Sequence, residues 1–185
     1  MGTRTPREAW IDAGLRALAT GGPDAVRIES LARALGVTKG GFYGYFTDRG
    51  ALLVEMLDAW EQRSVTDVIA TFERESGSVL ARATRAADLT FSEELLPVDL
   101  AVRDWARRDP AVAERLRRVD NQRMGLLRSA FGSAFPDEAE LEARCLLAFS
   151  AAIASHLIAA DHAQHSREEV LLRAAELLFP PADDG

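Results

Sequence analysis

IESLARALGVTKGGFYGYFT, residues 28–47, has the residue spacing of a helix-turn-helix unit. Such a unit needs a small residue where its two helices cross, and Ala32 supplies one. It also needs a left-handed turn residue, which glycine adopts at least cost, and Gly36 follows four residues later. The spacing therefore predicts two short helices, over about 28–35 and 38–46. The apolar residues expected to close the small core beneath them are Leu31, Leu35, Val37, Phe42 and Tyr45.

The second of these helices begins with the residues expected to contact DNA. Thr38 can cap it, and its first turn reads Lys39-Gly40-Gly41. In a helix-turn-helix this turn approaches base edges in the major groove. Lys39 is the only lysine in the chain, and its ammonium can reach a phosphate or a guanine edge; a solvated surface lysine is the alternative. Two glycines are poor helix formers, so they indicate either close backbone approach to DNA or a helix start that orders on binding.

The remainder of the chain also reads as helical, which predicts an all-α fold of nine helices. Alanine, leucine, arginine and glutamate recur, whereas β-branched and aromatic runs are few. Asp48 can cap a long helix over about residues 49–75, and Asp109-Pro110 marks a later helix start. Ser166 and Glu169 have the spacing of a capping box before the last helix.

The charge of the chain is unevenly distributed. The net charge is −7, but residues 1–50 hold seven basic and five acidic residues, a net charge of +2. The remaining residues hold 15 basic and 24 acidic ones, a net charge of −9. The N-terminal segment is therefore the part expected to approach phosphates.

Several protein classes are excluded by what the sequence lacks. A single cysteine, Cys145, rules out an internal disulfide framework and fits a reducing compartment. The N-terminus has no apolar stretch of signal-peptide length, and the longest apolar run, residues 146–154, is too short to span a bilayer. We therefore expect a cytoplasmic protein that does not enter a membrane.

The segment LARALGVTKGGFYGYFTDRGALL, residues 31–53, resembles the recognition segment of the TetR family of transcriptional regulators. The glycine turn, the threonine, the lysine-glycine pair, the aromatic pair and the final phenylalanine carry the resemblance, which covers roughly residues 7–55. The nine-helix layout extends it coarsely to the whole chain, and LAVRDWARRDPAVAERLRR, residues 100–118, adds a weaker match. The resemblance implies a ligand-responsive DNA-binding regulator, most often a repressor.

The resemblance also implies which residues contact DNA. Tyr43 and Tyr45 would donate hydrogen bonds to phosphates, although Tyr45 also fits the core. Arg27 stands where the family often has a Ser or Thr cap, and Arg49 replaces a lysine at the start of the long helix; either arginine can contact phosphate. The predicted DNA-binding residues are Arg27, Thr38, Lys39, Gly40, Gly41, Tyr43, Tyr45 and Arg49.

Two domains follow from the resemblance. Residues 1–48 would form a three-helix DNA-binding domain, and residues 49–185 a helical effector-binding and dimerisation domain. One unit reads only a few base pairs, so a homodimer on a palindromic operator is expected. Its interface would be a four-helix arrangement of the last two helices, although their apolar stripes can also be plain core. The predicted interface residues are Leu146, Phe149, Ile153, Leu157, Val170, Leu171, Ala174, Leu177 and Leu178.

The middle helices would then enclose a pocket for a small-molecule effector, uncharged or amphipathic. Each bulky residue predicted to line it is equally compatible with ordinary packing. The candidates are Trp60, Phe72, Phe91, Trp105, Met124, Leu127, Phe131 and Phe149. No cofactor is predicted.

Chemistry other than binding has little support in the sequence. His156, Asp161, His162 and His165 are clustered metal-ligand types, but their spacing favours a solvated helix end over a metal site. No phosphate loop, catalytic carboxylate pair or activated nucleophile is present, so we do not expect an enzyme. The competing interpretation is a helical interaction or carrier protein that retains an unused helix-turn-helix.

Overall fold

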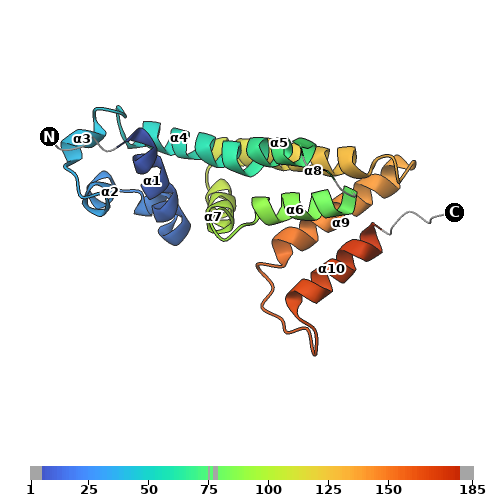
Figure 1. The fold of residues 1–185 in the computed structure, drawn as a ribbon. Helices are drawn as coiled ribbons and strands as arrows, with labels where there is room; N and C mark the ends of the chain where they lie inside the picture. Colours follow the sequence, from blue (N-terminus) through green and yellow to red (C-terminus); the bar gives the residue numbers. More distant parts are fainter. Residues whose placement is uncertain (1–5, 75, 77–78, 180–185) are drawn as a thin grey trace.

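The computed structural model describes residues 6–74, 76 and 79–179, and in these residues every regular element is helical (Figure 1). The N-terminal region carries a helix of 15 residues followed by three short elements of three to seven residues, and the elements after them vary from 5 to 22 residues. In chain order the elements are α1 (Arg7–Gly21), η1 (Pro23–Ala25), α2 (Ile28–Ala34), α3 (Lys39–Phe42), α4 (Arg49–Glu61), η2 (Gln62–Thr66), α5 (Asp67–Arg74), α6 (Val79–Thr90), α7 (Leu96–Ala106), α8 (Pro110–Phe131), α9 (Glu138–Ala154) and α10 (Arg167–Leu178).

The predicted long helix is present as a rod made of three consecutive segments. α4 passes into the π-helical stretch η2 and then into α5, so helical backbone runs from Arg49 to Arg74. Counting this rod as one helix and leaving out the three-residue 3-10 turn η1 gives nine helices in the described part of the chain, which confirms the predicted all-α fold. The π-helical stretch was not anticipated, because apolar spacing alone does not distinguish it from α-helix.

Side-chain caps fix where several helices begin. The Asp48 carboxylate accepts a hydrogen bond from the Ala51 amide at 2.9 Å, and Asp109 accepts one from the Ala111 amide at 3.0 Å. Ser166 and Glu169 form both bonds of a capping box. These bonds satisfy amides that a helix leaves unpaired in its first turn, and they confirm the three predicted helix starts.

A first apolar core joins the helix-turn-helix region to the middle of the chain. Trp10 of α1, Phe42 of α3 and Trp60 of α4 are fully buried in it, together with Val102 of α7 and Val119 of α8. α1 packs against both α4 and α7. The core therefore crosses residue 48, where the sequence suggested a domain boundary.

A second, smaller core lies at the far end of the rod from the helix-turn-helix. It contains Val68 and Phe72 of α5, Ala86 of α6, Phe131 of α8 and Phe179 after α10. The rings of Phe131 and Phe179 stack with their centroids 3.6 Å apart. Within the described residues, no helix has the length and apolar character needed to cross a membrane.

Candidate nucleic-acid interface and internal cavity

The turn between α2 and α3 has the geometry that its sequence predicts. Gly36 adopts φ +67°, in the left-handed region, and Ala32 is buried where the helices cross. The Val37 amide donates to the Ala32 carbonyl at 2.9 Å, which closes the turn. A larger residue at position 32 or a β-carbon at position 36 would strain this arrangement.

The second helix of the motif is shorter than predicted. We expected residues 38–46, but α3 ends at Phe42, and the Tyr45 amide then donates to the Phe42 carbonyl at 2.9 Å in a tighter turn. Gly40, Gly41 and Gly44 explain the difference, because glycine lowers helix stability by about 1 kcal/mol per residue. The predicted Thr38 cap is also wrong at the hydrogen-bond level. Thr38 has the extended backbone of a cap, but the Gly41 amide bonds its carbonyl at 3.0 Å and not its hydroxyl.

Most of the predicted DNA-binding residues are exposed, and most of the exposed ones lie in α3 or next to it. Tyr43 is 54% exposed. Its ring packs edge-to-face with the buried Phe42 ring, with the ring centroids 5.3 Å apart, and this contact helps to hold the Tyr43 ring in place. Tyr45 is half-buried against the first core, in agreement with its alternative role. The exposed members of the set are Arg27, Thr38, Lys39, Gly40, Gly41 and Tyr43.

Lys39 is held by an ion pair within the motif. Its Nζ lies 2.5 Å from Oε1 of Glu29, which links the start of α3 to α2. The hydrogen bond between them raises the pKa of Lys39 and lowers the pKa of Glu29. Both side chains are exposed, so a phosphate would compete with Glu29 for the ammonium in a screened environment.

The two arginines of the predicted set bind backbone carbonyls. Nε of Arg49 donates to the Val26 carbonyl at 2.7 Å, and its Nη2 donates to the Pro23 carbonyl. Nε of Arg27 donates to the Asp24 carbonyl at 3.1 Å. Arg49 thereby fastens the start of α4 to the segment before α2, so it contributes to the shape of the motif. Contact of either arginine with phosphate stays a prediction.

A cavity of about 650 Å³ lies among the rod, α6, α8, α9 and α10. Its lining is mainly apolar and includes five of the eight predicted pocket residues: Phe72, Phe91, Leu127, Phe131 and Phe149. Trp60 and Trp105 belong instead to the first core, and Met124 is buried outside the lining. Helical spacing placed all eight on apolar faces, but it does not say which neighbour each face meets.

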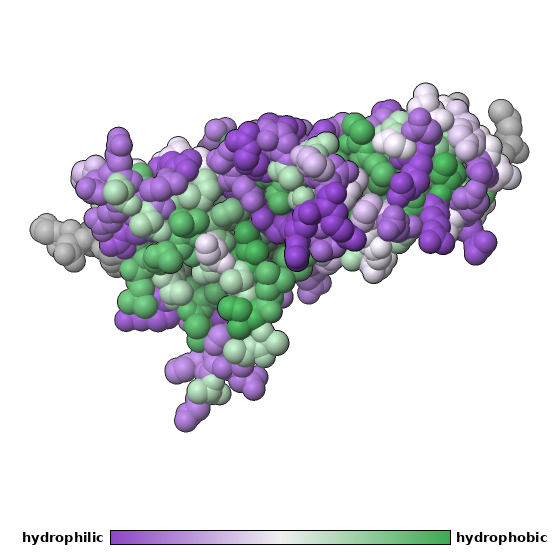
Figure 2. All heavy atoms as spheres, turned by 180° about the vertical axis from the view of Figure 1, so that it is seen from behind, coloured by the Kyte–Doolittle hydropathy of each residue, from purple (hydrophilic) through white to green (hydrophobic). Residues whose placement is uncertain are grey.

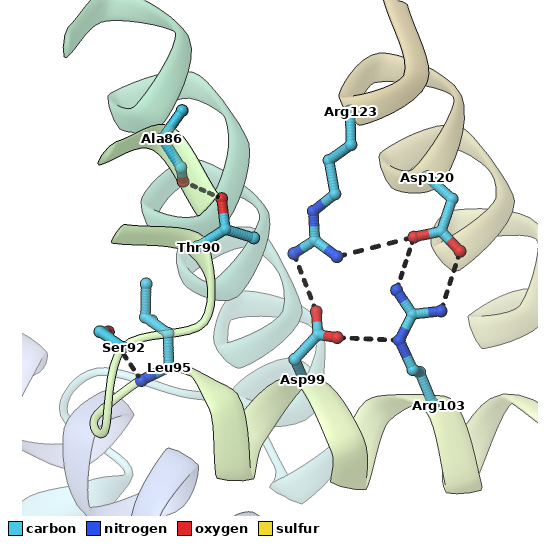
Figure 3. Close-up of polar contacts among 8 residues, drawn as sticks. All are labelled: Ala86, Thr90, Ser92, Leu95, Asp99, Arg103, Asp120 and Arg123. Carbon is cyan, nitrogen blue, oxygen red and sulfur yellow. Dashed lines mark hydrogen bonds and ion pairs between the residues drawn. The ribbon is translucent and has the colours of Figure 1, made fainter. Parts of the chain in front are cut away.

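An ion-pair cluster beside this cavity was missed by the sequence analysis (Figure 3). Asp99 of α7 is fully buried and accepts from Nε of Arg103 and from Nη2 of Arg123, both at 2.8 Å. Arg103 also binds Asp120 of α8 through two bonds of 2.9 and 2.7 Å. The i,i+4 spacing of Asp99 and Arg103 and the i,i+3 spacing of Asp120 and Arg123 were the available signals.

The last two helices divide their apolar residues between two faces. Phe149, Leu171, Ala174 and Leu178, all predicted at the dimer interface, line the cavity. Ile153 and Val170 are half-buried. Figure 2 shows apolar side chains gathered over the part of the molecule that carries α9 and α10. The large apolar residues exposed on these helices and just after α9 are Leu146, Leu147, Leu157, Ile158, Leu172 and Leu177, of which Leu147, Ile158 and Leu172 were not predicted.

The histidine cluster does not converge. His156 lines the cavity with its ring 6.0 Å from the Phe91 ring, and Asp161, His162 and His165 lie in the segment between α9 and α10. Among the described residues, no group of three or more His, Cys, Asp or Glu side chains is placed to hold a metal ion.

Comparison with known proteins agrees with the motif and the fold. Residues 11–56 match the family model described as bacterial regulatory proteins, tetR family. The chain is 32% identical over 90 residues to an uncharacterized HTH-type transcriptional regulator, YwcC, from Bacillus subtilis (strain 168). That alignment covers 46% of this chain and 40% of the relative.

Solved structures share the architecture over nearly the whole chain. A TetR transcriptional regulator from Legionella pneumophila has a TM-score of 0.72 at 13% identity, covering 96% of this chain and 97% of its own. FadR from Bacillus subtilis, in complex with stearoyl-CoA, has a TM-score of 0.68 at 14% identity, covering 95% and 98%. At these identities the likeness is one of fold.

The fold and the motif together define a helix-turn-helix protein with a larger helical region. Residues 11–56 match the TetR family of transcriptional regulators, as the resemblance of the recognition segment predicted, and the described chain shares the fold of a solved TetR regulator.

Proposed function

We propose that the chain binds double-stranded operator DNA as a homodimer through α3, represses transcription, and is released when a small molecule occupies the cavity. The observation that carries the proposal is the first turn of α3. Lys39, Gly40 and Gly41 are exposed there, and the buried Phe42 anchors the same short helix against Trp10, with ring centroids 5.4 Å apart. An exposed helix start that is anchored by a buried ring can enter the major groove and contact base edges.

The exposed apolar residues of α9 and α10 support the homodimer. Leu146 is 56% exposed and Leu177 is 67% exposed, and contiguous apolar patches on soluble proteins commonly mark interaction sites. A second copy using the same surface would form a closed, two-fold assembly. That assembly would present two α3 helices to a palindromic operator.

The cavity supports the effector. Its volume and apolar lining suit a small molecule, and FadR from Bacillus subtilis, which has the same fold, was solved in complex with stearoyl-CoA. α7 supplies a route from cavity to motif, because it holds Arg123 of the lining through Asp99 and packs against α1. In this mechanism the effector favours a dimer conformation whose α3 helices are wrongly spaced for DNA.

Fluorescence anisotropy with DNA from the promoter of the chain's own gene, across a salt series, tests the proposal. We expect saturable dimer binding that weakens steeply with salt. Lys39→Ala and Tyr43→Phe should each weaken binding. Only Lys39→Ala should also reduce the salt slope, by about 1, because it removes a cation, whereas the Tyr43 hydroxyl is neutral. Arg117→Ala is the matched control, because it removes an exposed cation of α8 away from the motif.

The competing function is that of a carrier or interaction protein with an unused motif. The cavity by itself is as consistent with a carrier as with a regulator. Two results would support the carrier over the regulator. One is the absence of preference for promoter DNA over random DNA at every salt concentration. The other is failure to recover an operator from a random-sequence selection with the purified dimer.

A further inference from the structure

Two polar side chains in the cavity lining have atoms without hydrogen-bond partners. Ser64 is fully buried and its Oγ has no partner, and Arg123 is 6% exposed with no hydrogen bond to its Nε or Nη1. Nη1 lies 3.6 Å from an Asp120 oxygen, whereas Nε has no such neighbour. Buried donors are nearly always satisfied, because leaving one unpaired is unfavourable.

Both side chains lie at the same end of the cavity. The Arg123 guanidinium is 5.8 Å from the ring of Trp60, which precedes Ser64 by four residues on the rod, and 5.7 Å from the ring of Phe91. Ser64 also lies in η2, and π-helical stretches occur frequently at functional sites.

The opposite end of the cavity is apolar. Phe72 follows Ser64 by eight residues, and Phe131 follows Arg123 by eight, which places each ring about 12 Å further along its helix. Both rings belong to the second core, with Val68 and Phe179 beside them. The cavity is therefore polar at the end near α7 and apolar at the end near the close of α10.

The charges around the polar end indicate a neutral ligand. Arg123 already neutralises Asp99, and Arg103 neutralises Asp120, so the cluster carries no surplus positive charge. The rest of the lining adds Arg167 but also the acidic residues Asp88, Glu93 and Glu168. A carboxylate placed there would be buried without a counter-ion, which is costly.

We propose that the cavity binds an uncharged molecule with an apolar body and one carbonyl oxygen, which accepts hydrogen bonds from Arg123 Nε and Ser64 Oγ. This inference rests on the proposed effector function and names the chemical class of the effector. Neither donor is open to solvent, so binding requires a neighbouring side chain such as the half-buried Phe91 to rotate. Arg123 also binds Asp99 of α7, and α7 packs against α1. A shift of Arg123 toward the ligand would therefore move α7 and, through it, α1.

Binding of three ligands of equal length tests the class: decan-2-one, decanoate and decane. Displacement of a bound apolar fluorescent dye gives each dissociation constant, and no DNA is present. We expect the ketone to bind most tightly. Ser64→Ala should weaken the ketone about 3- to 10-fold, the effect of one hydrogen bond, and leave decane unchanged. Ser155→Ala is the matched control, because its hydroxyl lines the cavity but already bonds the Ala152 carbonyl at 2.7 Å.

Each other outcome overturns a defined part of the inference. Tighter binding of decanoate would show that the site prefers an anionic ligand. Equal binding of ketone and decane would show that the site does not recognise the carbonyl group. An equal loss for all three ligands in Ser64→Ala would make Ser64 structural, and thermal unfolding of each variant identifies a folding defect. Operator binding without ketone binding would defeat this inference alone, whereas ketone binding without operator binding would defeat only the proposed regulator function.

Discussion

At the scale of single residues, Gly36 shows how the backbone of the motif is set. Its φ of +67° is unfavourable for any residue with a β-carbon, and an added β-carbon would meet nothing within 4 Å. The cost of a substitution there comes from the backbone alone. The same conclusion was available from sequence, because glycine at the turn of the motif has this one physical reason.

We therefore predict that Gly36→Ala lowers the free energy of unfolding by about 1–2 kcal/mol. Gly36→Asn should cost less, since asparagine tolerates the left-handed conformation. Urea unfolding at fixed protein concentration measures both changes. Gly125→Ala is the control, because Gly125 lies within α8 with open space around its β-position. Equal effects at positions 36 and 125 would contradict the backbone explanation.

Glu29 is a second residue whose partner the structure reveals: its carboxylate pairs with Lys39, and in the proposed complex it would compete with DNA phosphate for the ammonium. Replacing it by glutamine removes a negative charge from the exposed face of the motif. We predict that Glu29→Gln tightens DNA binding severalfold at low salt, with the advantage fading as salt screens the charge. Anisotropy at two salt concentrations measures this. Weaker binding in the variant would show that Glu29 positions Lys39 for contact.

At the scale of elements, α3 is short because its sequence is rich in glycine. The sequence left open whether Gly40 and Gly41 allow close approach to DNA or mark a helix that orders on binding. In the structure α3 is already helical over Lys39–Phe42, and an added β-carbon at Gly41 would point into open space. These features favour close approach.

Gly41→Ala separates the two explanations, because stability and DNA affinity should move in opposite directions. Alanine should stabilise α3 by up to about 1 kcal/mol. We expect DNA affinity to fall about tenfold, since the methyl group would stand between the backbone and the groove and disrupt a contact worth roughly 1–3 kcal/mol. Thermal unfolding and anisotropy give the two quantities. A gain in both would instead establish ordering on binding.

At the scale of the whole molecule, the first core joins the motif to α7, so the two predicted domains share one packed interior. Trp10 and Phe42 on one side and Val102 on the other are buried in the same core. A displacement of α7 would therefore be transmitted to α1 through close-packed side chains. The predicted boundary at residue 48 is therefore not a boundary in the packing.

The exposed leucines of the last two helices lead to a prediction about assembly. Leu177→Lys places a charge at the centre of the proposed interface, and we predict a shift from dimer to monomer at micromolar concentration. Sedimentation velocity measures the shift, and Val54→Lys is the control at an apolar residue of α4 that is 53% exposed. A dimer unaffected by Leu177→Lys, or one disrupted equally by Val54→Lys, would place the interface elsewhere.

Features that depend on neighbours along the chain could be predicted from the sequence. The caps at Asp48 and Asp109, the capping box at Ser166, the turn at Gly36 and the all-α class all follow from local conformational preference and helical spacing. The family resemblance of the recognition segment belongs with them, because that motif is a continuous stretch of chain.

The tertiary structure was needed to show what each helix face meets. It placed Trp60 in the first core and Phe72 in the cavity, and it turned Phe149 inward while Leu146 stayed exposed. It also brought Asp99 to Arg123 across 24 positions. The reason is physical: helical spacing states that a face is apolar, whereas packing among distant helices decides whether that face meets core, cavity or solvent.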